Sequence, residues 1–412
     1  MTATLSSPAA PVAELAPASR NLCVVLLVLL GFSLGCSEFV VIGIETELAD
    51  AFGVTLQNVG LVMSVFALAY ATCTPALALG TGRFRRYTLL IAYAALFVLG
   101  NAVAAMAPSF EVLLVSRVLI GAVSGAYLAV GVTFLPELLG ADKTSMAISI
   151  VYGAFSVAMV ISTSAGKMIA EYLDWHVAMV CVLVFSVVVS AALIAVLPRV
   201  GATDEPATAR EQVGLLAEPQ VLAGMAVFVF GVGSVYVFYG YVTPYLEEIL
   251  GMSAVGASGV LIGYGAMCLV SNILSGVFDA RFGMKALIPS FILQACILVA
   301  LFAVGGALVP ALAIIMALAL SMYVVSVPCI SMFMKTAYDK HPKALTLASS
   351  IEPMAFNIGI AFGTAVGGAV VSGPGMRFAG LVGAVFSLVA CGFVVLSLRF
   401  SARARAREAA RG

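Results

Sequence analysis

The chain has 412 residues, of which 63% are hydrophobic and only 10% are charged, with 20 Lys and Arg residues balanced by 20 Asp and Glu. A soluble domain carries about a quarter charged residues, so this composition excludes a water-soluble fold with a polar exterior. It also excludes a broad basic surface for nucleic acid. Repeated apolar stretches of about 20 residues instead predict an all-α integral membrane protein.

These apolar stretches form two sets of six along the chain. After an Ala-, Pro- and Ser-rich segment that we expect to be a disordered cytoplasmic tail (1–20), spans are predicted near 21–44, 57–79, 87–107, 110–135, 146–170 and 176–198. A polar cytoplasmic linker (199–217) precedes six more, near 219–246, 254–277, 286–306, 308–333, 347–371 and 378–399. The sequence thus predicts twelve transmembrane helices as two six-helix bundles, 21–198 and 218–400, followed by a basic cytoplasmic tail (401–412).

The basic residues give this twelve-span chain an orientation. Lys and Arg accumulate in the cytoplasmic loops of membrane proteins. With both termini in the cytoplasm, nearly all of the 20 basic residues fall on that side; Lys167 and Arg377 lie at outer ends, and Arg117 lies within a span. The predicted outer loops instead hold acids such as Glu45 and Glu247. This bias supports the even number of spans and the cytoplasmic placement of both termini.

Nothing in the sequence indicates an enzyme, a cofactor or a metal site. The eight cysteines fall singly in apolar stretches, without a CxxC pair or a nearby His at ligand spacing. A G-x-x-x-x-G-K-[ST] phosphate loop is absent, so ATP is not hydrolysed by that route. The two histidines, His176 and His341, are predicted at opposite membrane faces.

Glu38 in the first span is the main candidate for proton binding. A carboxylate within a span is costly to keep charged and marks an ion or proton pathway. Gly31 and Gly35 share its helical face and leave room for a neighbour or a water-filled cavity. Arg117 enters the fourth span to a similar depth, where a guanidinium needs a partner. We therefore expect Glu38 and Arg117 to influence one another; a hydrogen-bonded carboxyl and a fixed strut between helices are the alternatives.

Two polar residues of the eleventh span are further candidates. Glu352 is followed by Pro353, which removes a backbone donor and kinks helices. An acid there is predicted to attract a cationic substrate or to bind a second proton; a position near the interface that reaches water is the alternative. Asn357 lies deeper, where its amide can bind a ligand or another helix. Lys167 and Glu171, four residues apart, are interpreted as a snorkelling pair at an outer end.

Several motifs together resemble the major facilitator superfamily, and within it the twelve-span drug:proton antiporters, especially the sugar and arabinose efflux branch. They are Ser37-Glu38-Phe39 in span one, Arg117 with Gly121 and Gly125 in span four, Tyr239, Tyr241 and Pro244 ending span seven, and Ala355-Phe356-Asn357 followed by Gly359, Gly363 and Gly367-Gly368 in span eleven. The resemblance covers residues 22–399. It implies a carrier of a bacterial-type inner membrane, with its substrate site between two pseudo-symmetric bundles.

Combined with the residues above, the resemblance implies three groups of functional residues. Proton coupling is expected at Glu38 and Arg117. The substrate cavity is expected to include Phe39, Tyr127, Tyr239, Tyr241, Glu352 and Asn357. The basic cytoplasmic loops are expected to hold the inner side closed through Arg83, Arg85, Arg86, Asp279, Arg281 and Lys285, with Asp279 as the local acid; their alternative role is to orient the protein and to touch anionic lipid.

Two departures from the family pattern concern these expectations. The first loop has Thr81-Gly82 where the family has Asp followed by Arg, and Asp279 sits one place early in the second loop. Span five has Ser162-Thr-Ser-Ala-Gly166 without the proline of the antiporter pattern, which leaves the direction of transport open.

The predicted function is proton-coupled efflux of drugs, sugars or related metabolites by a monomer whose partners are its small-molecule substrate, protons and membrane lipids. A proton symporter or uniporter that imports a metabolite, and a non-transporting receptor or scaffold, are the alternatives.

Overall fold

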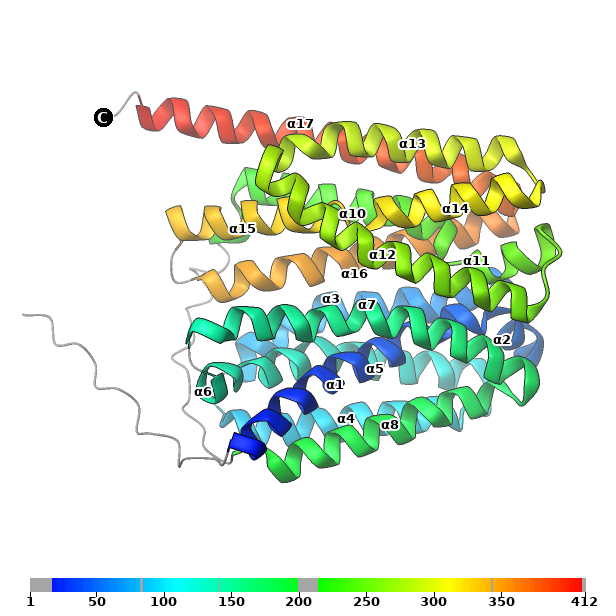
Figure 1. The fold of residues 1–412 in the computed structure, drawn as a ribbon, viewed down its shortest axis with the longest axis horizontal. Coiled ribbons are helices and arrows are strands. Elements are labelled where there is room, and N and C mark those ends of the chain that lie inside the picture. The colour runs from blue at the N-terminus through cyan, green and yellow to red at the C-terminus, as the bar shows by residue number, and fades with distance from the viewer. Residues whose placement is uncertain (1–16, 82–83, 140, 199–213, 342–343, 410–412) are drawn as a thin grey trace, which may run out of the picture.

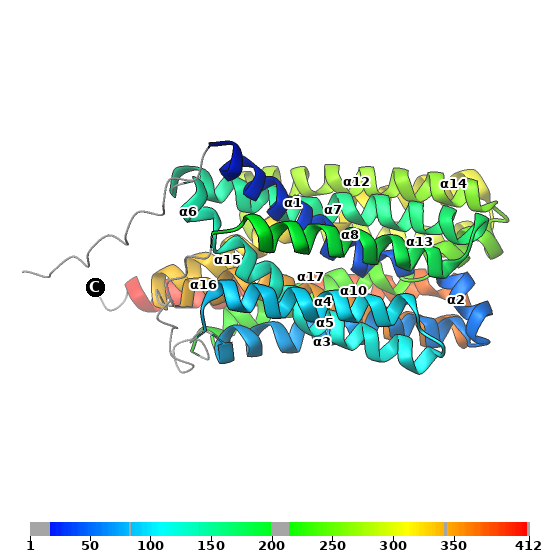
Figure 2. The same ribbon diagram turned by 90° about the horizontal axis from the view of Figure 1, so that it is seen from below.

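The computed structural model describes residues 17–81, 84–139, 141–198, 214–341 and 344–409. Most helices run along one common axis (Figure 1), with the helices before residue 199 in the lower half of the view and those after residue 213 in the upper half. The first helix begins and the last helix ends at the same end of the molecule, which we call the termini side. A short helix, α2, marks the opposite end, the α2 side (Figures 1 and 2).

The N-terminal half contains six long helices and two short ones. They are α1 (Pro17–Gly43), α2 (Glu45–Phe52), α3 (Leu56–Thr81), α4 (Arg86–Ala105), α5 (Phe110–Val132), α6 (Leu135–Leu139), α7 (Ala141–Tyr172) and α8 (Trp175–Val196). The predicted tail at 1–20 lies outside the described residues except for its last four, which belong to α1. The predicted linker lies outside them up to residue 213.

The C-terminal half repeats this plan with more interruptions. Its elements are α10 (Pro219–Tyr239), α11 (Val242–Pro244), the π-helix η1 (Tyr245–Ile249), α12 (Ala254–Phe282), the 3₁₀ turn η2 (Gly283–Ala286), α13 (Leu287–Val304), α14 (Leu308–Met322), α15 (Ser326–Lys340), α16 (Leu345–Ser372), the 3₁₀ turn η4 (Met376–Phe378) and α17 (Ala379–Ala409). The basic segment predicted as a tail continues α17 to Ala409, because Ala and Arg both favour helix.

The number of membrane crossings agrees with the prediction. Eleven helical stretches among the described residues are long and apolar enough to span a bilayer. One of them, Ala254–Val304, has 51 residues. At 1.5 Å per residue it would extend about 76 Å, more than twice the bilayer core, so it must cross twice, as α12 and as α13. Counting it as two confirms twelve crossings.

The two halves meet along two helix pairs: α3 packs against α16, and α7 packs against α12. Within the N-terminal half, α1 packs closely on α7 because its glycines admit the neighbouring backbone. A Cβ at Gly31 would lie 2.5 Å from the carbonyl oxygen of Val151, and one at Gly35 would lie 2.7 Å from Cβ of Ala158. The room predicted beside Glu38 is therefore filled by α7 on this face.

The tenth crossing is broken where the sequence suggested a continuous helix. Helix α14 ends at Met322 and α15 begins at Ser326, two residues before Pro328. Proline has no N–H to donate to the carbonyl of Val324. Ser271 and Ser275 of α12 replace the missing helical bonds: Ser275 donates to the carbonyl oxygen of Val324 (2.9 Å), and Ser271 accepts from the N–H of Tyr323 (2.9 Å). The break is thus stabilised by α12, and it fixes the position of Tyr323.

Candidate functional site

Arg117 of α5 is buried, with 1% of its surface exposed, and it holds the backbone of α1. Its Nη1 donates to the carbonyl oxygen of Ser37 (2.6 Å) and its Nη2 to that of Glu38 (3.1 Å). The guanidinium also lies over the ring of Phe66, 4.6 Å from the ring centre. These contacts compensate part of the cost of burying a permanent charge. The strut between helices, one alternative for Arg117, therefore exists in this structure.

Glu38 is also buried, with 3% of its surface exposed. No ion pair among the described residues joins its carboxylate to Arg117, which contacts the backbone of Glu38 instead. The two charged groups nevertheless lie within electrostatic range of one another. The Glu38 carboxylate thus lies near a cation without forming an ion pair with it.

A row of aromatic rings in the C-terminal half has two members near this carboxyl. Tyr264 stacks on Tyr239 (4.5 Å between ring centres), Tyr239 meets Tyr236 edge to face (5.5 Å), Tyr236 meets Phe356 (6.2 Å), and Phe356 stacks on Tyr323 (5.7 Å). The rings come from α12, α10, α16 and the break between α14 and α15. Tyr236 and Tyr323 lie within electrostatic range of Glu38, on the other half. We call these five rings the aromatic row.

Two polar atoms in or beside the aromatic row lack a partner among the residues that the structure describes. The hydroxyl of Tyr236 and Oδ1 of Asn357 are buried without a hydrogen bond, although Nδ2 of Asn357 donates to the carbonyl oxygen of Pro353 (3.0 Å). Buried polar atoms are normally satisfied, so such atoms indicate a place for a ligand or for water. Glu352 is half-buried nearby, within electrostatic range of Tyr323 and of Tyr70 on α3. Glu352 and Asn357 of α16 therefore both lie near the aromatic row.

Three other residues expected in the substrate cavity make contacts outside the aromatic row. Tyr127 is buried inside the N-terminal half, and its hydroxyl donates to Ser190 of α8 (3.1 Å). Phe39 is part of the hydrophobic core. Tyr241 donates to the carbonyl oxygen of Thr364 (2.9 Å) on the α2 side of the molecule. These contacts support a packing role for Tyr127 and Phe39, and a role for Tyr241 in closing the α2 side.

An ion-pair cluster joins the two halves on that side. Nζ of Lys167 lies 2.5 Å from Oε1 of Glu47 on α2 and 2.6 Å from Oε1 of Glu247 on η1. Thr46 donates to the other oxygen of Glu247 (3.1 Å). Burial raises the pKa of Glu47, although its hydrogen bond from Lys167 opposes the rise. The expected pair of Lys167 with Glu171 is present at 3.9 Å, but Lys167 is buried rather than snorkelling, and its shorter contacts are to Glu47 and, across the halves, to Glu247.

Several other polar contacts between the halves also lie toward the α2 side, and Asn272 of α12 donates to Ser156 of α7 (3.2 Å) farther from it. Ser164 and Ser258 donate to each other's carbonyl oxygens (3.3 and 3.0 Å), which ties α7 to α12. The hydroxyls of Ser64 and Thr364 are 2.6 Å apart, which ties α3 to α16. The α2 side of the molecule is therefore closed in this structure.

Of the predicted gating residues of the first loop, Arg86 makes contacts within its own half. Arg83 lies outside the described residues, and Arg85 is exposed. Nη1 of Arg86 donates to the carbonyl oxygen of Thr133 (3.2 Å) and pairs with Glu137 (3.0 Å). This contact attaches α4 to the connection between α5 and α6.

The predicted gating acid of the second basic loop, Asp279, also makes a contact within its own half. Asp279 accepts a hydrogen bond from Ser331 of α15 (2.6 Å). No ion pair among the described residues joins Asp279 to Arg281 or Lys285, which are both exposed. The pairing expected of Asp279 with these basic neighbours is thus not formed here.

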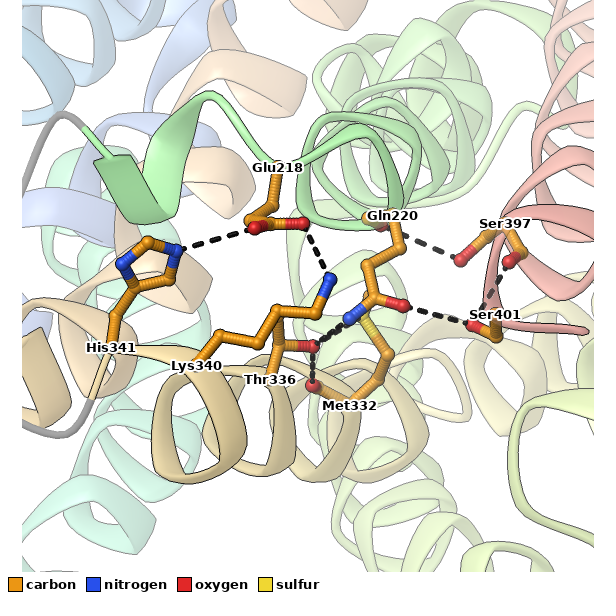
Figure 3. A network of polar contacts seen from close by, with 8 residues as sticks. All are labelled: Glu218, Gln220, Met332, Thr336, Lys340, His341, Ser397 and Ser401. Carbon is orange, nitrogen blue, oxygen red and sulfur yellow. Dashed lines mark hydrogen bonds and ion pairs between the residues drawn. The ribbon is translucent and has the colours of Figure 1, made fainter. Parts of the chain in front are cut away.

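A polar network on the termini side fastens the start of α10 to α15 and α17 (Figure 3). Glu218 accepts from Lys340 (2.8 Å) and lies 3.3 Å from Nε2 of His341. Gln220 donates to Thr336 (2.5 Å) and accepts from Ser401 (3.2 Å). Burial acts to raise the pKa of Glu218, but the bonds from Lys340 and His341 lower it overall. This network also stays within one half.

Sequence reasoning missed two parts of this arrangement. The Lys167 cluster was missed because its acids belong to two predicted outer loops about 200 residues apart. One signal was available: Glu47 and Glu247 occupy equivalent places after the first spans of the two halves. Tyr323 was missed because its position depends on a break that serines of α12 stabilise; Pro328 in span ten was the available signal for the break.

Comparison with known proteins shows which family the sequence matches. The family model "Major Facilitator Superfamily" matches residues 27–351. The MFS-type transporter YtbD of Bacillus subtilis (strain 168) is 27% identical over 89% of this chain and 92% of its own length. The inner membrane transport protein YdhP of Escherichia coli (strain K12) is 27% identical over 89% and 94%. A protein of Mannheimia succiniciproducens named "Probable sugar efflux transporter" is 24% identical over 92% and 94%.

The fold also matches solved structures. A bacterial homologue of the human lysosomal transporter Spinster, in an inward-facing and occupied conformation, superimposes with a TM-score of 0.73 over 94% of this chain and 98% of that one, at 15% identity. The family match covers most of the chain, the twelve crossings form two bundles, and the relatives are bacterial membrane transporters. The chain belongs to the major facilitator superfamily.

Proposed function

We propose that this protein is a proton-coupled exporter of small organic molecules. The observation that carries the proposal is Glu38, a carboxyl buried at the interface of the two halves and free of any ion pair among the described residues. Such a group can take up a proton from one side and release it to the other as the halves rock. The relative named for sugar efflux supports export as the direction.

Coupling follows from how Arg117 holds α1. When Glu38 is protonated, Arg117 keeps its bonds to the carbonyl oxygens of Ser37 and Glu38. When Glu38 loses its proton, its negative charge competes with those carbonyls for the guanidinium, because charge-assisted hydrogen bonds are the stronger ones. The exchange moves α1 relative to α5, and α1 packs directly on α7 at the interface with the other half. Proton release is thereby linked to movement of the halves.

The substrate is proposed to bind between Glu38 and the aromatic row. Stacked rings contact an apolar or aromatic body, or the face of a sugar ring. The unpaired hydroxyl of Tyr236 and Oδ1 of Asn357 bind polar substituents of the ligand, and Glu352 attracts compounds that carry a positive charge. Neutral sugar-like molecules and cationic drug-like molecules both fit this combination.

The closed α2 side represents one state of alternating access. We infer that the termini face the cytoplasm, as the basic loops indicate, so that the closed side faces outward. In this state the substrate enters from the cytoplasm. Release requires the Lys167 cluster and the serine pair of α7 and α12 to separate.

Inside-out vesicles test the proposal directly. A panel of drugs, sugars and nucleosides is offered to vesicles that contain the protein, with an interior-acid pH gradient imposed or dissipated. At least one compound should accumulate only with the gradient, and Glu38→Gln should abolish that accumulation. Glu248→Gln, which neutralises an exposed acid, is the matched control and should retain it. Gradient-dependent accumulation by Glu38→Gln would refute the assignment of the proton site.

A further inference from the structure

Glu45, the first residue of α2, is a buried acid without a partner. Only 1% of its surface is exposed, and neither carboxyl oxygen accepts a hydrogen bond from a described residue. It forms no ion pair with any residue that the structure describes. An ionised carboxylate in such a place would lack both water and a compensating charge, which is strongly unfavourable.

The surroundings of Glu45 belong to both halves. Glu47 lies close enough to repel it, and Tyr239 and Tyr241 of the C-terminal half lie within its electrostatic range. Helix α2 packs against α3 of its own half and against α11 of the other half. The titratable groups near this end of these and adjoining elements are Glu38 on α1, Glu47 and Asp50 on α2, Lys167 and Glu171 on α7, Tyr239 at the end of α10, Tyr241 directly before α11, and Tyr245, Glu247 and Glu248 on η1; α11 itself has none, and α3 has none before Tyr70.

The one cation among these groups is already engaged. Lys167 pairs with Glu47 and Glu247, so two carboxylates share a single ammonium before Glu45 is counted. A metal ion is not indicated, because the described residues contain no group of three His, Cys, Asp or Glu side chains able to hold one. A proton is therefore the ligand that removes the charge of Glu45.

We propose that Glu45 is a second proton-binding site, located in the gate on the α2 side: the halves close there with Glu45 protonated, and Glu45 releases its proton when they separate. Separation removes α11 from α2 and admits water to the carboxyl. The inference rests on the proposed function for its two states of alternating access. It adds a role that Glu38 does not have, since protons on the outer side then favour closure of the outer gate.

The direction of the pH effect follows from linkage. Burial, and next the repulsion by Glu47, raise the pKa of Glu45 well above 4.5 in the closed state. In the open state, where water reaches it, the pKa returns toward 4.5. The ratio of closed to open molecules is therefore constant below about pH 4.5, falls about tenfold per pH unit between the two pKa values, and is constant again above the closed-state pKa.

Distances between spin labels across the gate measure this ratio in the purified full-length protein in lipid nanodiscs. Cysteines at Ala51 on α2 and Val255 on α12 carry the labels, because both positions are exposed and uncharged. The native cysteines are replaced by alanine. The short-distance population should fall as the pH is raised from 5 to 9. With Glu45→Gln, which mimics the protonated acid, the short distance should persist over the whole range.

An unlabelled second measurement covers the case in which the labelled protein does not fold. The single Trp175 packs against Phe52 of α2, with ring centres 5.3 Å apart, so its fluorescence reports movement of α2. His176, which stacks on Trp175, is present in both proteins, so the difference between wild type and Glu45→Gln isolates Glu45.

Three outcomes decide the proposal. A pH-dependent change that is present in the wild type, persists in Glu248→Gln and disappears in Glu45→Gln supports it. A wild type that does not change with pH overturns it, as does a Glu45→Gln variant that changes like the wild type. None of these results depends on substrate, so they remain distinct from a failure to find gradient-driven transport.

Discussion

Replacing Lys167 by Met should open the α2 side of the transporter. The substitution keeps the length and apolar stem of the side chain and removes its charge. Nζ of Lys167 lies 2.5 Å from Glu47 and 2.6 Å from Glu247, and its side chain is 2% exposed against 17% and 18% for the two acids. Without the ammonium, two carboxylates from opposite halves would face each other with little water.

The size of the effect follows from this burial. Removing one partner of a buried ion pair costs about 3–5 kcal/mol, because the other charge stays uncompensated. Since both acids retain some contact with water, the lower end of about 3 kcal/mol applies. At 1.4 kcal/mol per factor of ten, the equilibrium between closed and open states should shift by about a hundredfold toward open.

The rate at which a buried cysteine is alkylated measures this shift. Ser258→Cys, placed at the contact of α7 with α12, is introduced into both backgrounds and treated with a membrane-impermeant maleimide from the α2 side. Lys167→Met should raise the rate by up to about a hundredfold, and Lys167→Arg should stay near the parent rate. Glu171→Gln removes only a 3.9 Å contact of an exposed acid and should change the rate less than about threefold. A Lys167→Met rate within threefold of the parent would refute the role of the cluster as a gate.

Three further predictions concern other parts of the molecule. Glu352→Gln should reduce transport of cationic compounds by about tenfold relative to neutral ones, measured in competition on the same vesicles, because an attractive charge near the binding region is lost. Arg117→Lys should lower the free energy of unfolding by about 2 kcal/mol, since an ammonium cannot reproduce the paired donation to the carbonyls of Ser37 and Glu38; an unchanged melting temperature in detergent would contradict this. The lowered pKa of Glu218 stabilises the fold above its ordinary value of 4.5, and that stability is lost as the pH falls through the lowered value. Thermal melting between pH 6 and pH 3 should therefore show a decline in the wild type that Glu218→Gln lacks.

The fold was largely predictable because the hydrophobicity of a span and the charge of a loop can both be read from consecutive residues. Runs such as 176–198 must cross the bilayer, and the basic loops gave an even count that the structure confirms. What the sequence did not reveal depends on contacts between distant segments. The break after Met322 is stable because serines of α12 satisfy the freed backbone groups, and no feature of span ten announces those partners.

Part of the candidate site was also predictable, because some of its residue types are unusual within a membrane span. Glu38 and Arg117 stood out because charge inside a span is rare, and they do meet. Their contact runs through the backbone of α1, a detail that side-chain types cannot indicate. Tyr127 was expected in the substrate cavity because it is a tyrosine within a span; in the structure its hydroxyl donates to Ser190 inside one half, a contact that the residue type alone does not indicate.

The direction in which a compound moves when the pH gradient is reversed tests proton-coupled export most directly. Purified protein is reconstituted into liposomes, and the uptake of a transported compound is followed with the interior more acidic than the medium, and then with the gradient reversed. Antiport predicts that outward proton flow drives uptake, that reversal drives release, and that Glu38→Gln shows neither. Outward proton flow that expels the compound would establish symport, and flux that ignores both gradients would remove proton coupling altogether.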